Sequence, residues 1–143
     1  SDFELPEPFG IELGEIFDKD IVLEVDDKWR GEFEYYVTPP IFNESFETYY
    51  VRTLHNIVYE IYAKGNAGDS CKDRLNFYVD FLSYKYGGII KESGEWTFVQ
   101  AKVKRLNSKG VIVPEFGINI YCHEKTIHIR YRKLPAFNIE GLD

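Results

Sequence analysis

Alternating apolar and polar positions mark the strands of this chain. Residues 48–52 and 57–64 both follow the two-residue period that is typical of half-buried strands, and Asn56 lies between them in a segment suited to a turn. The two segments therefore predict an antiparallel hairpin. A further strand is predicted over residues 34–38, and it ends at Pro39 because proline has no amide hydrogen to give to a sheet.

The same period returns in the second half of the chain. Residues 96–105, 116–123 and 126–133 alternate in this way, and segments rich in turn residues join them, including the tight pair Glu124-Lys125. Three successive strands with short connections predict an antiparallel meander.

Between these two groups of strands, the spacing of apolar residues changes to three and four. This spacing predicts one helix over about residues 70–86, which Asp69 or Ser70 caps and Gly87-Gly88 ends. The stripe that should pack on the sheet consists of Cys71, Leu75, Tyr78, Val79, Leu82 and Tyr86. The opposite side carries three large aromatic side chains: Phe77, Phe81 and Tyr84.

Such a contiguous set of aromatic side chains is expected to have a cover. The sequence leaves two covers open: the proline-rich N-terminal segment folding back over the helix, and a second protein chain. We favour the N-terminal segment, because Phe3, Leu5 and Phe9 also need a place to be buried.

Together with a short strand over residues 21–25, these elements predict a single α+β domain over residues 1–143. Its sheet is expected to be mostly antiparallel, with five to six strands, and the main helix packs on it. Residues 1–34 form an acidic N-terminal segment that we expect to pack on the helix and the sheet. The longest apolar runs have only a few residues, far short of the about 20 that a spanning helix needs, so we expect no membrane span.

The charge of the chain is concentrated at its start. The net charge is −7, yet residues 1–34 sum to −9 and the other 109 residues sum to +2. This asymmetry favours a basic protein partner for the acidic segment and argues against nucleic acid or an anionic membrane there. A segment that is merely solvated is the alternative interpretation.

Two cysteines and the absence of methionine bear on the compartment. A bond between Cys71 and Cys122 would close a loop of 52 residues and stabilise the fold by roughly 4 kcal/mol. Both residues are predicted to point inward, which favours a disulfide from helix to sheet, and two buried free thiols are the alternative. A chain without methionine suggests that a leader was removed, either a secretory signal with or without a lipid anchor, or a tag.

No residue pattern predicts catalysis, a metal site or a cofactor. His123 and His128 flank Glu124, as in the zinc-protease signature, but they are five residues apart rather than four and lie in a predicted hairpin instead of a helix. Neither cysteine has a histidine and an orienting carboxylate nearby in the sequence, as a nucleophilic pair would need. We therefore assign no catalytic residue, no metal ligand and no cofactor.

One face of the C-terminal meander is predicted to be cationic. Along residues 126–133 and 96–105, basic side chains alternate with apolar ones. The predicted partner-binding residues of this face are Lys102, Lys104, Tyr121, His128, Arg130 and Arg132. An ordinary solvated sheet face is the alternative, and the net negative charge argues against an RNA platform.

Several short segments resemble small exported bacterial proteins of poorly assigned function. They are Pro8-Phe9-Gly10-Ile11 with Leu13-Gly14, Val37-Thr38-Pro39-Pro40, Tyr50-Val51-Arg52, Val58-Tyr59-Glu60-Ile61 and Lys85-Tyr86-Gly87. This resemblance implies a periplasmic or lipoprotein-type setting, in which small domains often act as inhibitors or immunity proteins. It assigns no functional residue.

These observations favour a non-catalytic protein-binding domain, periplasmic or secreted, that inhibits or neutralises a partner protein. Phe77, Phe81 and Tyr84 join the residues of the cationic face as candidate contacts. Two alternatives stay open: a small hydrolase or ligand-binding domain with its site between the helix and the N-terminal segment, and a self-associating envelope protein. The oligomeric state is not predicted.

Overall fold

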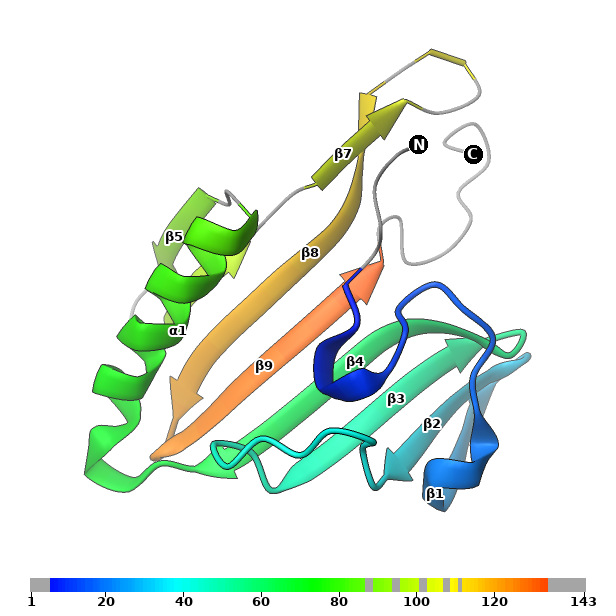
Figure 1. Ribbon diagram of the computed structural model, residues 1–143, viewed down its shortest axis with the longest axis horizontal. Coiled ribbons are helices and arrows are strands. Elements are labelled where there is room, and N and C mark those ends of the chain that lie inside the picture. The colour runs from blue at the N-terminus through cyan, green and yellow to red at the C-terminus, as the bar shows by residue number, and fades with distance from the viewer. Residues whose placement is uncertain are drawn as a thin grey trace.

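The computed structural model describes residues 6–86, 89–93, 96–100, 103–106, 109–110 and 112–133. Over these residues the chain is a single α+β domain, in which one helix packs on an antiparallel sheet, as Figure 1 shows. This architecture confirms the predicted fold class.

The main sheet has seven strands, in the order β1-β2-β3-β4-β9-β8-β7, and each neighbouring pair is antiparallel. Their bounds are β1 (Val22–Trp29), β2 (Glu32–Val37), β3 (Thr48–Leu54), β4 (Ile57–Asn66), β7 (Val103–Leu106), β8 (Ile112–His123) and β9 (Thr126–Lys133). The predicted hairpin is β3–β4, and the predicted meander is β7–β8–β9. Both are therefore confirmed.

The segment predicted as one strand over residues 96–105 is divided in the structure. Its first part, β6 (Trp96–Gln100), pairs with β5 (Ile89–Ser93) in a separate two-stranded sheet, and its second part forms β7. β5 was not predicted, so the structure has more strands than the expected five to six. β6 also lies beside β8, which keeps the small sheet close to the large one.

Two-residue turns join three of the strand pairs. Both turn residues have positive φ at His55-Asn56 and Glu124-Lys125, and the same holds for Arg30-Gly31 between β1 and β2. Two positive φ values are typical of the turn type whose twist matches that of antiparallel strands. These turns set the register of the sheet.

Helix α1 (Cys71–Tyr86) follows a single 3₁₀ turn, η3 (Gly68–Ser70), and packs on the sheet through its predicted stripe. Cys71, Leu75, Val79 and Leu82 are buried, while Tyr78 and Tyr86 are partly buried against the same core. The inward residues of the strands complete this core, including Val51, Ile61, Ile118 and Ile129. The predicted packing face of the helix is thus confirmed.

The N-terminal segment covers the same side of the sheet as α1. Ile11, Leu13 and Phe17 belong to the core, and backbone hydrogen bonds from Gly14 N to Val58 O and from Val58 N to Glu15 O hold the segment beside β4. Two short 3₁₀ turns, η1 (Pro8–Gly10) and η2 (Lys19–Ile21), shape its path. The sheet is therefore covered on one side by α1 and by this segment.

The described part of the N-terminal segment, from residue 6 onward, does not cover the aromatic side of the helix, where Phe77, Phe81 and Tyr84 are exposed. Phe9 packs against Phe46 and Tyr49, with ring centroids 5.7 Å and 5.0 Å away, instead of lying on α1. Phe3 and Leu5 lie outside the described residues. The apolar positions of the segment follow the strands, because their two-residue spacing fits the sheet better than the helix.

Candidate partner-binding surface

The side of the sheet opposite to α1 is lined by half-buried polar and aromatic side chains. Residues alternate between buried and half-buried along β3 and along β9 as far as Arg132, so every second side chain points away from the core. We call this surface the open face. Its side chains form rows that cross the strands.

One row consists of aromatic rings. Tyr36, Tyr50 and Tyr62 lie opposite one another on β2, β3 and β4, and the series continues with His128 on β9 and Tyr121 on β8. The ring centroids are separated by 5.6 Å, 5.5 Å, 5.8 Å and 4.5 Å in turn. This aromatic row crosses five neighbouring strands.

Four of the five rings of the aromatic row stack on one another, whereas Tyr36 is tilted by 54° against Tyr50. The planes of Tyr50 and Tyr62 differ by 19°, those of Tyr62 and His128 by 8°, and those of Tyr121 and His128 by 11°. The stacked part of the row therefore places aromatic rings, three of them with a hydroxyl group, side by side on the open face.

His128 is held in its neutral form at the centre of this row. The hydroxyl group of Tyr62 lies 2.5 Å from Nδ1 of His128. Partial burial, together with the nearby charges of Lys64 and Arg130, lowers the pKa of His128 to about 4. The ring therefore acts as a stacking partner and hydrogen-bonding group at neutral pH, and not as a cation.

A second row consists of alternating charges. Arg52 Nε lies 3.0 Å from Glu34 Oε1 and 3.4 Å from Glu60 Oε2, and Arg132 Nε donates to Glu60 Oε1 at 2.9 Å. The side chain of Glu60 is only 2% exposed, and the two arginines offset the cost of burying its negative charge. The face predicted to be cationic thus also holds carboxylates, and Glu60 of β4 neutralises Arg132 within the chain.

Lys64 and Arg130 differ from these arginines. The guanidinium carbon of Arg130 lies 4.5 Å from the centroid of the Tyr62 ring, and Lys64 Nζ lies 5.8 Å from the centroid of the Tyr50 ring. Within the described residues, no carboxylate lies within ion-pair distance of either side chain. Among the residues that the structure describes, these two cations thus have no carboxylate partner on the open face.

Two predicted members of the face are not placed. Lys102 lies outside the described residues. The backbone of Lys104 is in β7, opposite Pro114 of β8, and its side chain is not described. Tyr121, His128, Arg130 and Arg132 do lie together on the open face, as predicted.

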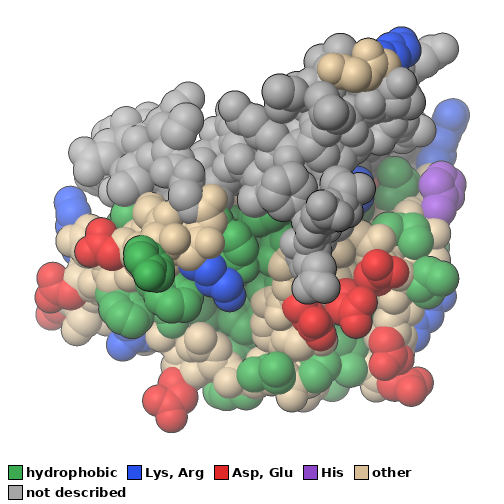
Figure 2. Space-filling view, turned by 45° about the horizontal axis from the view of Figure 1, so that its top comes forward, with side chains coloured by type: hydrophobic (Ala, Val, Ile, Leu, Met, Phe, Trp, Pro, Cys, Tyr) green, Lys and Arg blue, Asp and Glu red, His purple; other side chains and the backbone are tan. Residues whose placement is uncertain are grey.

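The aromatic side of α1 forms a second exposed surface on the other side of the molecule. The side chains of Phe77, Phe81 and Tyr84 are 61%, 50% and 92% exposed, and the rings of Phe77 and Phe81 are 6.4 Å apart. Figure 2 shows hydrophobic side chains over α1 and acidic ones gathered over the N-terminal segment. The three predicted residues are thus accessible, but the open face and this surface are not continuous.

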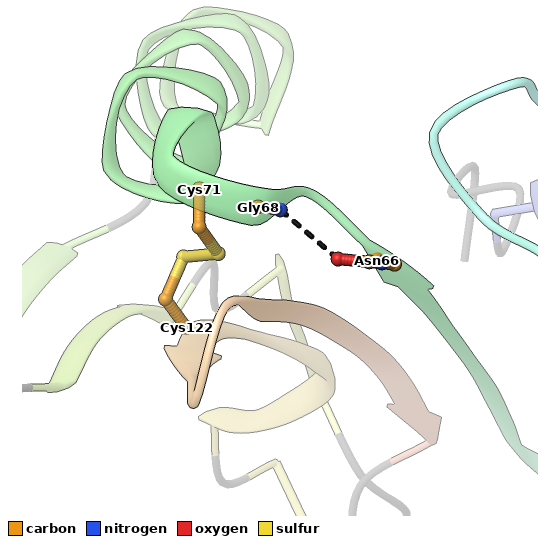
Figure 3. Close-up of a disulfide and its surroundings, with 4 residues drawn as sticks. All are labelled: Asn66, Gly68, Cys71 and Cys122. Carbon is orange, nitrogen blue, oxygen red and sulfur yellow. Dashed lines mark hydrogen bonds between the residues drawn. A yellow bond between two sulfur atoms is a disulfide. The ribbon is translucent and has the colours of Figure 1, made fainter.

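Cys71 and Cys122 form a disulfide, which resolves the two states that the sequence left open. The bond joins the first residue of α1 to the end of β8, and the Cα atoms are 6.1 Å apart (Figure 3). Just before the helix, the amide of Gly68 donates to the side chain of Asn66 at 3.0 Å. The disulfide thus fixes the start of the helix to the sheet.

A cavity of about 350 Å³ lies under the N-terminal segment. Ile16, Phe17 and Ile21 line it together with Pro40 and Val58. No residue of α1 is part of its lining, so the cavity differs in position from the predicted ligand site between the helix and this segment. In the described part of the chain, no group of three or more His, Cys, Asp or Glu side chains is arranged to hold a metal ion, and no helix is long and apolar enough to cross a membrane.

Of the four tyrosines in the aromatic row, only Tyr121 was predicted from the sequence, and Tyr36, Tyr50 and Tyr62 were missed. Tyr50 and Tyr62 occupy alternating positions of the predicted hairpin, and this alternation was the available signal. Their direct pairing also depends on an irregularity of β4, where the register shifts between Arg52 and Thr53 of β3 so that Tyr59 is an additional residue. Tyr36 joins the row through the β2–β3 register.

Comparisons with known proteins place the chain in no family. No model of a known protein family matches it, and no curated protein matches it. One solved structure with a similar arrangement is a cysteine-rich secretory protein from Staphylococcus aureus, with a TM-score of 0.42 and 13% sequence identity. The match covers 92% of this chain and 49% of that protein, so the chain spans about half of its length.

Proposed function

We propose that this chain is a non-catalytic protein-binding domain that inhibits or neutralises a partner protein through its open face. The observation that carries this proposal is the aromatic row, which places four tyrosines and a neutral histidine next to uncompensated cations. Tyrosine and arginine are the side chains enriched at the centres of protein interfaces.

The stacked arrangement also lowers the entropic cost of binding. Each inner ring of the row is already restricted by its neighbours, so little side-chain freedom remains to be lost when a partner binds. Tyr62 is further fixed by its contacts with His128 and Arg130. A rigid surface with many hydroxyl groups suits a specific protein partner.

The disulfide supports a periplasmic or secreted location. Disulfides persist in oxidising compartments and are rare where thioredoxin and glutathione keep thiols reduced. The bond between Cys71 and Cys122 therefore favours an extracytoplasmic site of action.

Affinity capture from the native host tests this function. The bait is the oxidised chain, compared with an open-face variant, Tyr50→Ser with Tyr62→Ser, and with a helix variant, Phe77→Ser with Phe81→Ser. We expect the same protein to be captured by the wild type and the helix variant, and its binding to weaken at least tenfold in the open-face variant. Melting curves establish that each bait is folded.

Two results would contradict the proposal. One is that no protein binds reproducibly to the wild type. The other is that the helix variant loses the partner while the open-face variant keeps it.

A further inference from the structure

We propose that the open face recognises an acidic, extended segment of its partner, whose carboxylates pair with Lys64 and Arg130. This inference rests on the function proposed above and specifies the chemistry of the partner. Its basis is the difference between the cations of this face that have a carboxylate and those that lack one.

The alternating charges of the second row are satisfied within the chain. Glu34 pairs with Arg52, and Glu60 lies between Arg52 and Arg132. A partner carboxylate would gain little there, because it would compete with a carboxylate already in place. The acidic segment must therefore be recognised elsewhere on the face.

Arg130 is held ready for such a carboxylate. Its guanidinium group is stacked over the ring of Tyr62, and its Nε is buried without a hydrogen-bond acceptor. Because Nε has almost no exposed surface, a partner carboxylate would bind the other nitrogen atoms of this half-buried side chain. The planar guanidinium group is also suited to bind a carboxylate through two parallel hydrogen bonds.

The position of Lys64 determines the spacing of the acids. Lys64 lies opposite His128 on the neighbouring strand, and Arg130 is two residues beyond His128 on the same side. Diagonal neighbours of this kind have Cβ atoms about 7–8 Å apart. Alternate side chains of an extended chain are separated by about 6.6 Å, so acidic residues at positions i and i+2 match the two cations.

The charges of neighbouring groups favour an acidic partner segment over β4 and β9. His128 lies between Lys64 and Arg130 in its neutral form, so it adds no charge but can donate a hydrogen bond. At the far edge of the sheet, Glu24 of β1 lies opposite Tyr36 and is exposed, so it would repel an acidic segment. The segment is thereby directed to β4 and β9.

The inference is tested by titrating the protein with short synthetic peptides and measuring the NMR chemical shifts of the protein. The probe is an acetylated and amidated peptide in which Glu and Ser alternate, and its control has Gln in place of Glu. We expect the acidic peptide to shift the resonances of Lys64, Arg130 and Tyr62 at millimolar concentrations, and the control peptide to shift none of them.

Substitutions assign the effect to the two cations. Lys64→Gln and Arg130→Gln are each expected to weaken binding about threefold, and the double variant about tenfold, in line with the strength of partly exposed ion pairs. Lys72→Gln is the matched control, because Lys72 is an exposed cation of α1. Arg130→Lys should retain only part of the affinity, since lysine cannot form the paired hydrogen bonds.

The same titration compares the acidic peptide with other classes of ligand. A single-stranded RNA oligonucleotide or an anionic lipid vesicle that binds more tightly than the acidic peptide would overturn the inference, as would equal binding of the peptide to the double variant. If a captured partner depends on Tyr50 and Tyr62 but is unaffected by Lys64→Gln with Arg130→Gln, the proposed function stands and only this inference fails. If the peptide binds as expected but no partner depends on the tyrosines, the proposed function fails instead.

Discussion

Gly65 shows how a single residue shapes the covered side of the sheet. A Cβ atom built on Gly65 would lie 2.1 Å from the carbonyl oxygen of Ser45 and 2.9 Å from Cα of Phe46. The segment before β3 therefore crosses β4 backbone against backbone, and the amide of Glu47 donates to the carbonyl of Lys64 at 2.9 Å. Only a residue without a side chain fits at this crossing.

Gly65→Ala is expected to lower the free energy of unfolding by about 2 kcal/mol, because the crossing segment must move away from the added methyl group. Urea unfolding of the oxidised protein measures this change. A loss below about 0.5 kcal/mol would show that the segment adapts without cost.

His128 gives the stability of the domain a defined dependence on pH. Its pKa is lowered to about 4 in the folded chain, whereas an unfolded histidine has a pKa near 6.5. A lowered pKa means that the unfolded state binds the proton more readily. Stability is therefore full above about pH 6.5 and decreases as the pH falls toward 4.

His128→Gln should remove this part of the pH dependence. We expect the wild type to lose roughly 1–3 kcal/mol more than the variant between pH 7 and pH 4, after allowance for solvent screening. Urea unfolding of both proteins across this range measures the difference, and carboxylates common to both cancel in the comparison. Parallel curves for the two proteins would contradict the prediction.

At the scale of elements, the disulfide links α1 to β8. The bond spans 51 residues in the sequence and joins the start of the helix to the end of the strand. Leu75, Val79 and Leu82 continue the contact along the core. The helix is thus held both by a covalent bond and by apolar packing.

The double variant Cys71→Ala with Cys122→Ala should lower the free energy of unfolding by about 4 kcal/mol, the value expected for closing a loop of this length. Calorimetry or urea unfolding of the variant, compared with the wild type before and after reduction, checks this estimate. The reduced wild type should resemble the variant. An oxidised protein no more stable than the variant would contradict it.

The elements that the sequence predicted well are those whose signal is local. The β3–β4 hairpin, the β7–β8–β9 meander and α1 follow from periodicity and turn residues, and the disulfide follows from two cysteines that both point inward. The division of residues 96–105 into β6 and β7 carries no such signal, because its alternation continues across the break. β5 was not predicted for another reason, because its sequence IIKES does not alternate between apolar and polar residues.

At the scale of the whole molecule, the sheet separates two surfaces of different chemistry. One side carries α1 and the acidic N-terminal segment, and the other carries the aromatic row and the paired charges. The alternation in the sequence predicted which residues of β9 face outward, but it did not predict which side chains of the neighbouring strand they pair with. Glu60 neutralises Arg132 only because β4 and β9, distant in the sequence, are neighbours in the sheet.

The position of the disulfide has a mechanical consequence. β4 leads into α1 near Cys71, and β8 turns into β9 directly after Cys122. A pulling force applied to the two ends of the chain would pass along β4, cross the sulfur bridge and continue into β9. Residues 72–121, including the helix and its exposed aromatic side chains, would bear no tension and could not be extended while the disulfide is intact.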